Sequence, residues 1–245
     1  VSFSPDGKYI ATASFDKTVR LWDSIGNLIQ EFKGHQNLLL SVSFSPDSKY
    51  MATASFDKTA RLWDVTGKHI KKFIGPQDGV SSVNLSPDGK YIVVISGDKA
   101  VRLWDLTGKL IQEFKGHQDG VRSVSFSSDG KYLATSDDKT VRLWDLKGKL
   151  IQEFKGHQDS VSSVSFSSDG KYLAISDDKT VRLWDLKGKL IQEFKGHQDS
   201  VSSVSFSPDG KYIATASFDK TARLWDVVKG KLIQEFKGHQ DSVSS

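Results

Sequence analysis

Cysteine is absent from this chain of 245 residues, so it offers no disulfide, no thiolate ligand for zinc and no cysteine nucleophile. Long apolar runs are missing too: the longest covers about five residues, 91–95, whereas a membrane-spanning helix needs roughly 20. No charge of one sign dominates, because 34 basic and 30 acidic side chains are interleaved and leave a net charge of +4. This balance argues against an obligate nucleic-acid binder.

Motifs that carry chemistry are also scarce. The sequence has no glycine-rich phosphate loop, zinc-binding spacing, EF-hand loop or nucleophile elbow, and its six His are spread through the chain. We therefore expect no enzyme activity, cofactor, metal or small-molecule substrate. A cysteine-free chain suits a reducing compartment, so a cytoplasmic protein is expected. The start at Val1, without Met or a signal-like segment, predicts a piece excised from a longer protein.

The dominant feature is an internal repeat. The dipeptide Trp-Asp occurs six times, at successive spacings of 41, 41, 40, 40 and 41 residues. Segments 117–156 and 157–196 differ at only three of forty positions, Gly120/Ser160, Arg122/Ser162 and Thr135/Ile175. A fixed period of this size is typical of solenoids, propellers and arrays. No linker interrupts the repeats, so we expect one domain over residues 1–245.

Within one repeat, every local signal is that of a short strand or a turn. Segments 201–206, 212–216, 221–225 and 232–236 are rich in β-branched and aromatic residues. Between them lie Ser-Pro-Asp-Gly, Ser-Phe-Asp-Lys and Lys-Gly-Lys, which are turn sequences. No window has helical periodicity, so each repeat is predicted to form a four-stranded sheet, and the sheets to stack radially as the blades of a propeller.

Gly-His, Ser-Pro-Asp-Gly, Ser-x-Asp-Lys-Thr and Arg-Leu-Trp-Asp recur in this order, and the pattern resembles the WD-repeat β-propeller family over essentially the whole chain. The resemblance implies an all-β propeller of six four-stranded antiparallel blades. It also implies a non-catalytic scaffold that binds a protein or peptide segment. The repeat units would be 238–245 joined with 1–33, then 34–74, 75–115, 116–155, 156–195 and 196–237.

The two ends of the chain complement each other. Residues 238–245 followed by residues 1–7 read like residues 196–210 without a gap. We therefore predict that six blades close by pairing the N- and C-terminal segments in one blade. The alternative is a six-repeat fragment of a seven-bladed or oligomeric propeller, because the family more often has seven blades. A stable monomer in solution would support closure, and a defined oligomer would contradict it.

Most repeats also carry His, Ser, Asp and Trp at fixed offsets. His, Ser and Asp are the components of a hydrolase triad, but five copies and the added Trp favour a buried hydrogen-bond chain. The resemblance implies a structural tetrad that ties the loop before the first strand to the second and third strands. The expected tetrads are His35–Ser55–Asp57–Trp63, His117–Ser136–Asp138–Trp144, His157–Ser176–Asp178–Trp184, His197–Ser217–Asp219–Trp225 and, across the termini, His239–Ser14–Asp16–Trp22.

Three blades depart from this pattern. In the third blade Pro76 replaces the His and leaves Ser96, Asp98 and Trp104 without a fourth partner, so this blade is predicted to be the least protected from hydrogen exchange. Blades four and five are one residue shorter between the second and third strands. A one-residue slip changes side-chain faces, so we expect a β-bulge to be gained or lost there.

The loops of a blade alternate between two faces because its strands alternate in direction. The Gly-His loops and Ser-x-Asp turns share the first face. The second face carries the Pro-Asp-Gly-Lys and Trp-Asp turns and is rich in lysine, but neighbouring aspartates offset much of that charge. Binding of nucleic acid or an anionic surface to the second face is therefore the alternative function, and nucleic acid is not the expected partner.

The outer strand of blade two is unusually basic. It reads Lys68, His69, Lys71 and Lys72 where sibling strands read Lys-Leu-Ile-Gln-Glu. These residues either hold an acidic partner or a phosphate, or they block edge-to-edge pairing, which is the commoner use of lysine on an edge strand.

The near-identical repeats differ most on the first face. Just before the Asp of the turn they carry Phe15, Phe56, Gly97, Asp137, Asp177 and Phe218. The resemblance implies that this position and two at the start of the first strand line a partner-binding rim, where blade two has Leu38 and Leu40 and blade four has Arg122. We expect an apolar arc of Phe15, Phe56, Phe218, Leu38 and Leu40 opposite an acidic arc of Asp137 and Asp177.

Such a rim would bind a protein or peptide ligand with an apolar anchor and basic flanks. The competing interpretation is that each Phe packs between blades and covers a neighbouring turn.

Overall fold

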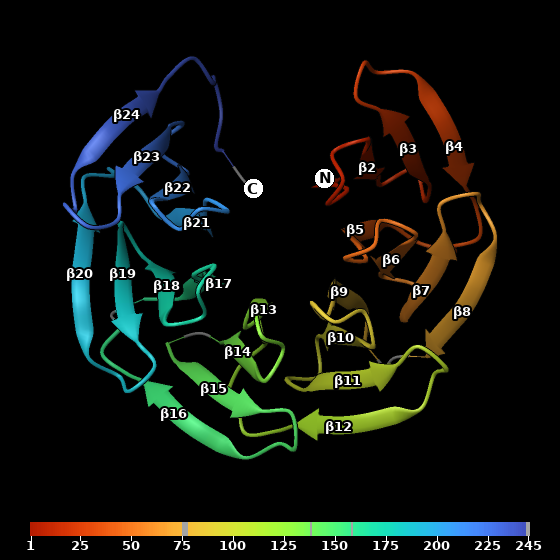
Figure 1. The fold of residues 1–245 in the computed structure, drawn as a ribbon, viewed down its shortest axis with the longest axis horizontal. Helices are drawn as coiled ribbons and strands as arrows, with labels where there is room; N and C mark the ends of the chain where they lie inside the picture. Colours follow the sequence, from red (N-terminus) through yellow and green to blue (C-terminus); the bar gives the residue numbers. More distant parts are fainter. Residues whose placement is uncertain (75–77, 138, 158, 244–245) are drawn as a thin grey trace. The chain divides into compact units, whose positions relative to one another are not determined.

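All regular structure in the described residues is β-strand. The computed structural model describes residues 1–74, 78–137, 139–157 and 159–243, and these form six sheets of four strands each (Figure 1). Each sheet is one sequence repeat, and its strands pair antiparallel in chain order. The expected all-β fold of six four-stranded antiparallel blades is therefore confirmed. None of the described residues form a helix that is long and apolar enough to cross a membrane.

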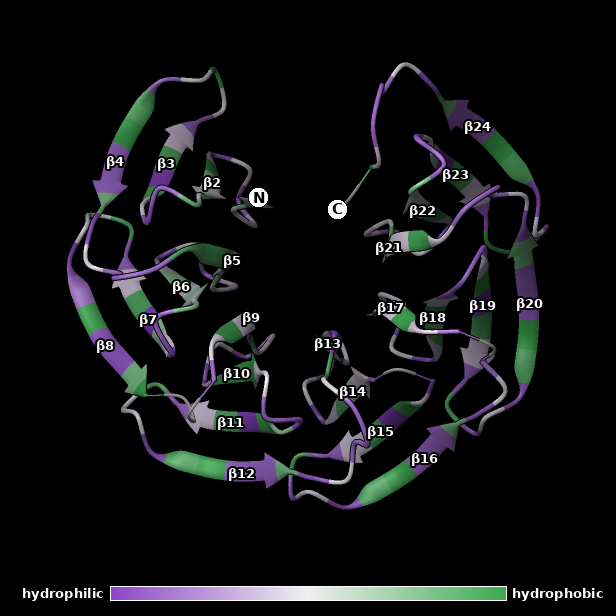
Figure 2. Ribbon diagram, turned by 180° about the vertical axis from the view of Figure 1, so that it is seen from behind, coloured by the Kyte–Doolittle hydropathy of each residue, from purple (hydrophilic) through white to green (hydrophobic). Residues whose placement is uncertain are grey.

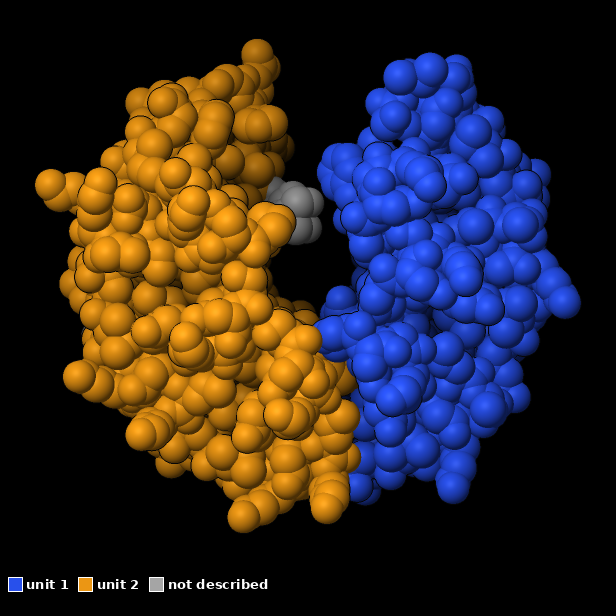
Figure 3. Space-filling view, in the orientation of Figure 1, with its two compact units in different colours: residues 1–121 blue, residues 122–245 orange. Residues whose placement is uncertain are grey.

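The chain divides into two compact units, residues 1–121 and 122–245 (Figure 3). Unit 1 contains blades one to three, with strands β1 (Ser2–Phe3), β2 (Tyr9–Ala13), β3 (Val19–Asp23), β4 (Leu28–Phe32), β5 (Leu39–Phe44), β6 (Tyr50–Ser55), β7 (Thr59–Asp64), β8 (His69–Ile74), β9 (Val80–Leu85), β10 (Tyr91–Ser96), β11 (Val101–Asp105) and β12 (Leu110–Phe114).

Unit 2 contains blades four to six. Its strands are β13 (Ser123–Phe126), β14 (Tyr132–Ser136), β15 (Val141–Asp145), β16 (Leu150–Phe154), β17 (Val161–Phe166), β18 (Tyr172–Asp177), β19 (Thr180–Asp185), β20 (Leu190–Lys195), β21 (Val201–Phe206), β22 (Tyr212–Ser217), β23 (Ala222–Asp226) and β24 (Leu232–Phe236).

The core of each unit lies between neighbouring sheets. In unit 1, Leu62 and Phe73 of blade two pack against Val80 and Ile92 of blade three, and all four are almost fully buried. Small side chains on the second strands, such as Ala52 and Ala54, let the sheets approach closely. Hydrophobic and hydrophilic segments alternate along the outer strands (Figure 2), and in β12, β16 and β20 the Phe is buried while the Leu-Ile pair at the start of the strand is exposed.

Serine side chains also join neighbouring first strands. In unit 2, the Ser123 hydroxyl accepts a hydrogen bond from the Val164 amide, and the Ser163 hydroxyl accepts one from the Val204 amide. The two bonds are one repeat apart, so they hold successive blades in one register.

The one-residue deletion in blades four and five lies in a turn. Ser176 pairs with Val181 across β18 and β19, just as Ala216 pairs with Ala222 in blade six, and no register shift interrupts either pair of strands. The turn in blade five is a two-residue hairpin in which Asp178 adopts a φ of +44°. The shorter turn absorbs the deletion, so the second and third strands keep their register and their faces, and the expected change of side-chain face does not occur. The difference lies in the loop, which in blade six has three residues and ends on Lys220 with a φ of +69°.

Candidate functional site

The polar sets of blades two and six are nearly identical hydrogen-bond chains. In blade two the Trp63 indole donates to the Thr53 hydroxyl at 3.0 Å, and Thr53 donates to His35 Nε2 at 2.8 Å. His35 Nδ1 donates to Asp57 at 2.8 Å. The carboxylate can only accept, so the Nδ1–H tautomer of a neutral imidazole satisfies every member.

Blade six repeats this arrangement with His197, Thr215, Asp219 and Trp225. The His197–Asp219 distance is 2.8 Å, and the Thr215 hydroxyl lies 2.7 Å from His197 Nε2 and 3.0 Å from the Trp225 indole nitrogen. In both blades the chain ties the Gly-His loop to the second and third strands.

Thr, and not Ser, is the hydroxyl member of these chains. Ser55 instead donates to the Asn37 carbonyl and accepts from the Asp57 amide, and Ser217 makes the corresponding contacts with Asp199 and Asp219. The assignment of Ser55 and Ser217 to the tetrads was wrong. In each blade the Thr and the Ser lie two residues apart on the same face of the second strand, but the Thr is the one that accepts from the Trp indole. Within the described residues, neither Ser55 nor Ser217 forms the hydrogen bond to the imidazole that a hydrolase triad requires.

Burial sets the protonation of these groups. It lowers the pKa of His35 and of His197, although Asp57 and Asp219 oppose the shift. Burial alone would raise the pKa of Asp57, but hydrogen bonds from Thr59, the Gln36 amide and His35 hold it below its usual value. The buried pair is thus a neutral imidazole beside a carboxylate that stays ionised.

In blades four and five the first Asp of the shortened turn takes the structural place of the acid. Asp177 Oδ2 lies 3.1 Å from His157 Nδ1 and also pairs with Arg182. Asp137 accepts hydrogen bonds from the amide and hydroxyl of Thr140. Asp178 is a turn residue with positive φ, so its assignment to the tetrad was wrong. Asp138, assigned to the same role, lies outside the described residues.

This placement removes the expected acidic arc. Asp137 and Asp177 are only 3% and 1% exposed, because the deletion turns both carboxylates into their own blades. They cannot present charge to a partner, and the expectation that they line the rim was wrong. Ser136 and Ser176 occupy the register position of Ala54 in blade two and Ala216 in blade six, and the buried Ser136 hydroxyl has no hydrogen-bond partner among the described residues.

Blade five also lacks the Thr. Ile175 stands in its place, so His157 Nε2 and the Trp184 indole nitrogen are buried without hydrogen-bond partners in the part of the chain that the structure describes. Blade four retains Thr135, whose hydroxyl accepts from the Trp144 indole at 2.9 Å, and His117 is buried nearby on the Gly-His loop.

Blades one and three have different arrangements. In blade one the Trp22 indole donates to Thr12, while Asp16 pairs with Arg20 and Ser14 accepts from the Asp16 amide. The pairing of His239 with these residues across the termini stays a prediction.

In blade three Val94 replaces the Thr, and Arg102 binds both Asp98 and Ser96. Arg102 thus pairs with Asp98 in a blade whose sequence has no His at the position of the Gly-His loop. Pro76, to which that loss was assigned, lies outside the described residues.

An exposed apolar group lies on the first face of unit 1. Phe15 and Phe56 are 68% and 47% exposed, and Leu38 and Leu40 are half-buried. Backbone bonds connect these positions: the Leu39 amide donates to the Ser14 carbonyl, and the Phe56 amide donates to the Leu38 carbonyl at 3.0 Å. We call Phe15, Leu38, Leu40 and Phe56 the apolar rim.

Unit 2 contains the two remaining expected rim residues. Phe218 is 47% exposed, and its amide donates to the Ser200 carbonyl, as that of Phe56 does to Leu38. Arg122 is exposed at the start of the blade-four sheet.

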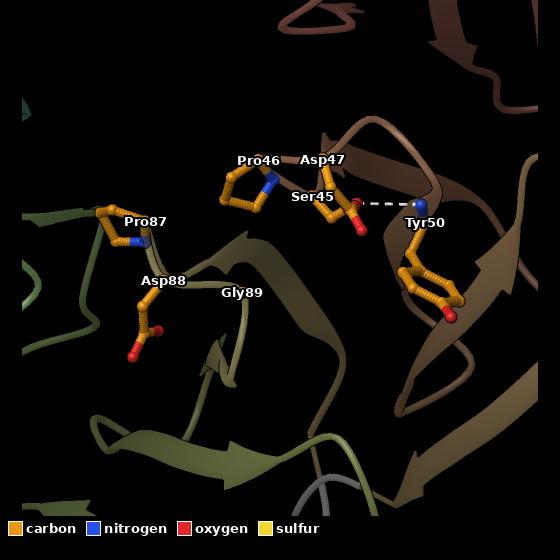
Figure 4. Close-up of a pocket in the computed structure, with 7 residues that line it drawn as sticks. All are labelled: Ser45, Pro46, Asp47, Tyr50, Pro87, Asp88 and Gly89. Atoms are coloured by element: carbon orange, nitrogen blue, oxygen red, sulfur yellow. Dashed lines mark hydrogen bonds between the residues drawn. The ribbon is translucent and has the colours of Figure 1, made fainter.

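On the second face, lysines are paired locally. Lys8, Lys90, Lys131, Lys171 and Lys211 each lie 3.2–3.6 Å from the Asp two residues earlier in the same turn. Between the turns of blades two and three is a cavity of about 170 Å³, where Pro46 and Pro87 come from facing turns (Figure 4). It is smaller than a typical ligand pocket. Among the described residues, no group of three or more His, Asp or Glu side chains could hold a metal ion.

The comparisons with known proteins agree with this architecture. The family model described as "WD domain, G-beta repeat" matches residues 1–23, 26–64, 67–105, 108–145, 148–185 and 188–226. The chain is also similar to a protein called "Notchless protein homolog" from Arabidopsis thaliana, with 64% identity over 36 residues, or 14% of this chain. That match covers 8% of the relative, far less than two thirds of its length.

Proposed function

The chain belongs to the WD40 repeat family, and on that premise we propose that it is a non-catalytic scaffold whose apolar rim anchors a segment of a partner protein. The observation that carries this proposal is the exposure of Phe15 and Phe56 beside Leu38 and Leu40 on one face of unit 1. Exposed aromatic side chains gathered in one place are typical of partner sites, whereas single ones need no explanation.

Packing against a neighbouring blade covers only part of Phe56. A Cβ built on Gly79 would lie 2.4 Å from the Phe56 ring, so one edge of that ring covers the start of blade three. Phe56 as a whole residue is still 47% exposed, and Phe15 is exposed further. The rim thus combines a fixed orientation with accessible apolar area, which favours an apolar anchor from a partner.

The proposed ligand differs from the expected one in its flanks. Because Asp137 and Asp177 are buried, nothing in their placement favours Lys or Arg beside the anchor. The alternative function, binding of an anionic surface through the second face, loses support because the turn lysines there are paired with aspartates. The Notchless relative, similar over a single repeat length, adds only that related repeats occur in a longer protein.

A peptide-array screen followed by affinity measurements tests the proposal. Phe15→Ser and Phe56→Ser should each weaken a captured ligand by about 2 kcal/mol, close to thirtyfold, because buried aromatic anchors dominate such sites. Ile25→Ser is the matched control, since Ile25 is 84% exposed in a second-face turn of the same unit. Phe218→Ser tests separately whether the corresponding exposed Phe of unit 2 binds a ligand. If the folded Phe variants keep every ligand and Ile25→Ser loses them, the proposed face is wrong.

A further inference from the structure

Five of the six blades carry the same ion pair between the third strand and the outer strand. The Arg of the third strand lies directly opposite a Glu of the outer strand, and the shortest distances between the two side chains are 2.5–3.3 Å. The pairs are Arg20–Glu31, Arg102–Glu113, Arg142–Glu153, Arg182–Glu193 and Arg223–Glu235.

Blade two reverses the charge at this position. Arg61 faces Lys72 across β7 and β8, so two cations stand where the other blades have a pair of opposite sign. Like charges directly opposite one another destabilise a sheet. Arg61 Nε is buried without a hydrogen-bond partner, and across the described residues neither Arg61, Lys68, Lys71 nor Lys72 forms an ion pair.

The Arg61 guanidinium is nevertheless held in the same place as its counterparts. It lies 5.8 Å above the Trp63 ring and beside Gly34, where an added Cβ would be 2.6 Å from Nη1. Arg223 of blade six lies 6.0 Å above Trp225 and beside Gly196 in the same way. Blade two is therefore a copy of blade six in which the acceptor carboxylate of Glu235 has been removed.

Strand β8 has one free edge, since it pairs only with β7 among the described strands. Ile70, Lys72 and Ile74 are exposed at alternate positions, apolar then basic then apolar. His69 before them is exposed as well, and the pairing with β7 shifts register beside Ile70. Burial, Arg61 and Lys72 lower the pKa of His69, which is consistent with an excess of positive charge around the strand.

We propose that β8 binds an extended acidic protein segment as an added antiparallel or parallel strand. Its backbone would pair with the free edge, and a Glu or Asp side chain would lie against Lys72 and Arg61, supplying the carboxylate that the sheet lacks. Apolar side chains two residues before and after that acid would cover Ile70 and Ile74. This site is separate from the apolar rim and does not depend on the function proposed for it.

A fluorescence anisotropy titration tests this site. The probe is a labelled peptide with valine, glutamate and valine at alternate positions separated by threonine, and the comparison peptide has glutamine in place of glutamate. We expect the glutamate peptide to bind at least about tenfold more tightly. Lys72→Glu, which restores the pair found in the other blades, should remove that preference. Lys149→Glu, the same charge change at an exposed residue of unit 2, should not.

Two further arms separate strand addition from attraction to charge alone. N-methylation of alternate peptide amides should abolish binding, because an added strand needs its backbone hydrogen bonds. Binding should also protect the amides of residues 69–74 from hydrogen exchange. Equal binding of the two peptides, binding that survives Lys72→Glu, or complete displacement by inorganic phosphate or single-stranded DNA would each overturn the proposal. Phe15→Ser should leave this binding unchanged, so failure here is distinguishable from failure of the apolar rim.

Discussion

Blades five and six lie in the same unit and have nearly the same sequence, yet their buried polar sets differ. Blade six joins His197, Thr215, Asp219 and Trp225 in one satisfied chain. Blade five has a shorter turn and Ile175, so its acid comes from one residue earlier, and its imidazole Nε2 and indole nitrogen lack hydrogen-bond partners among the described residues. The comparison teaches that a residue's place in the sheet register, and not its position in a sequence motif, decides whether its side chain joins the buried hydrogen-bond chain.

The largest expected effect separates the two aspartates of blade five. Asp177→Asn should lower the free energy of unfolding by about 3 kcal/mol, because it removes the anion from a buried pair with Arg182. Asp178→Asn should change it by less than about 0.5 kcal/mol, since Asn accepts a positive φ. Urea unfolding of both variants is the measurement, and equal losses would contradict the assignment of Asp177.

The second-largest effect is expected when blade six is made to resemble blade five by removing its Thr hydroxyl. Thr215→Val should cost about 2 kcal/mol, because it leaves both His197 Nε2 and the Trp225 indole without a hydrogen bond. Thr215→Ser retains the hydroxyl and is the matched control. Chemical unfolding distinguishes them, and a Val variant as stable as the Ser variant would show that the hydroxyl is dispensable.

The reverse change should stabilise blade five. Ile175→Thr supplies a hydroxyl to two unpaired groups, and we expect this gain to exceed the roughly 1.6 kcal/mol lost with two buried carbon groups, leaving roughly 1 kcal/mol. Slower hydrogen exchange in β18, together with a higher urea midpoint, is the expected result. A variant less stable than the parent would mean that packing of Ile175 outweighs its polar neighbours.

The smallest effect is a gradual pH dependence. The folded-state pKa values of His35 and His197 lie below the usual 6.5, so the unfolded chain binds more protons in mild acid. Stability should be fully present above about pH 6.5 and decline as the pH falls below it. A second decline should follow below about pH 4, where the lowered pKa values of Asp57 and Asp219 apply. Unfolding at a series of pH values checks both, and constant stability from neutral pH to about 5 would contradict the first.

Periodicity and turn chemistry were sufficient to predict six antiparallel four-stranded sheets, because strand alternation and turn residues are local signals. They also placed His35, Asp57 and Trp63 near one another. They missed Thr53, because the Ser-x-Asp motif marks Ser55, whereas the strand register places Thr53 beside His35 and Trp63. One signal was available: Thr135/Ile175 is among the three differences between two otherwise identical repeats.

The roles of Asp137 and Asp177 could not be predicted from sequence. Whether a deletion lies in a strand or in a turn depends on the pairing of both strands, and the letters Ser-Asp-Asp allow either. The lack of an acidic partner for Arg61 could not be predicted either, because it depends on which residue of β8 lies opposite Arg61.

The shortened turn has a consequence for how repeats of this kind can be exchanged. In blades four and five the first turn residue is itself an aspartate, so losing one residue left a carboxylate in place. Removing Phe218 from blade six would put Ser217 at that position, and removing Ser217 would put Phe218 there, so neither deletion preserves an acid. The length of the turn and the identity of its first residue must therefore change together if the carboxylate is to be kept. Recombination or design that grafts one without the other will leave a blade with an unbalanced histidine.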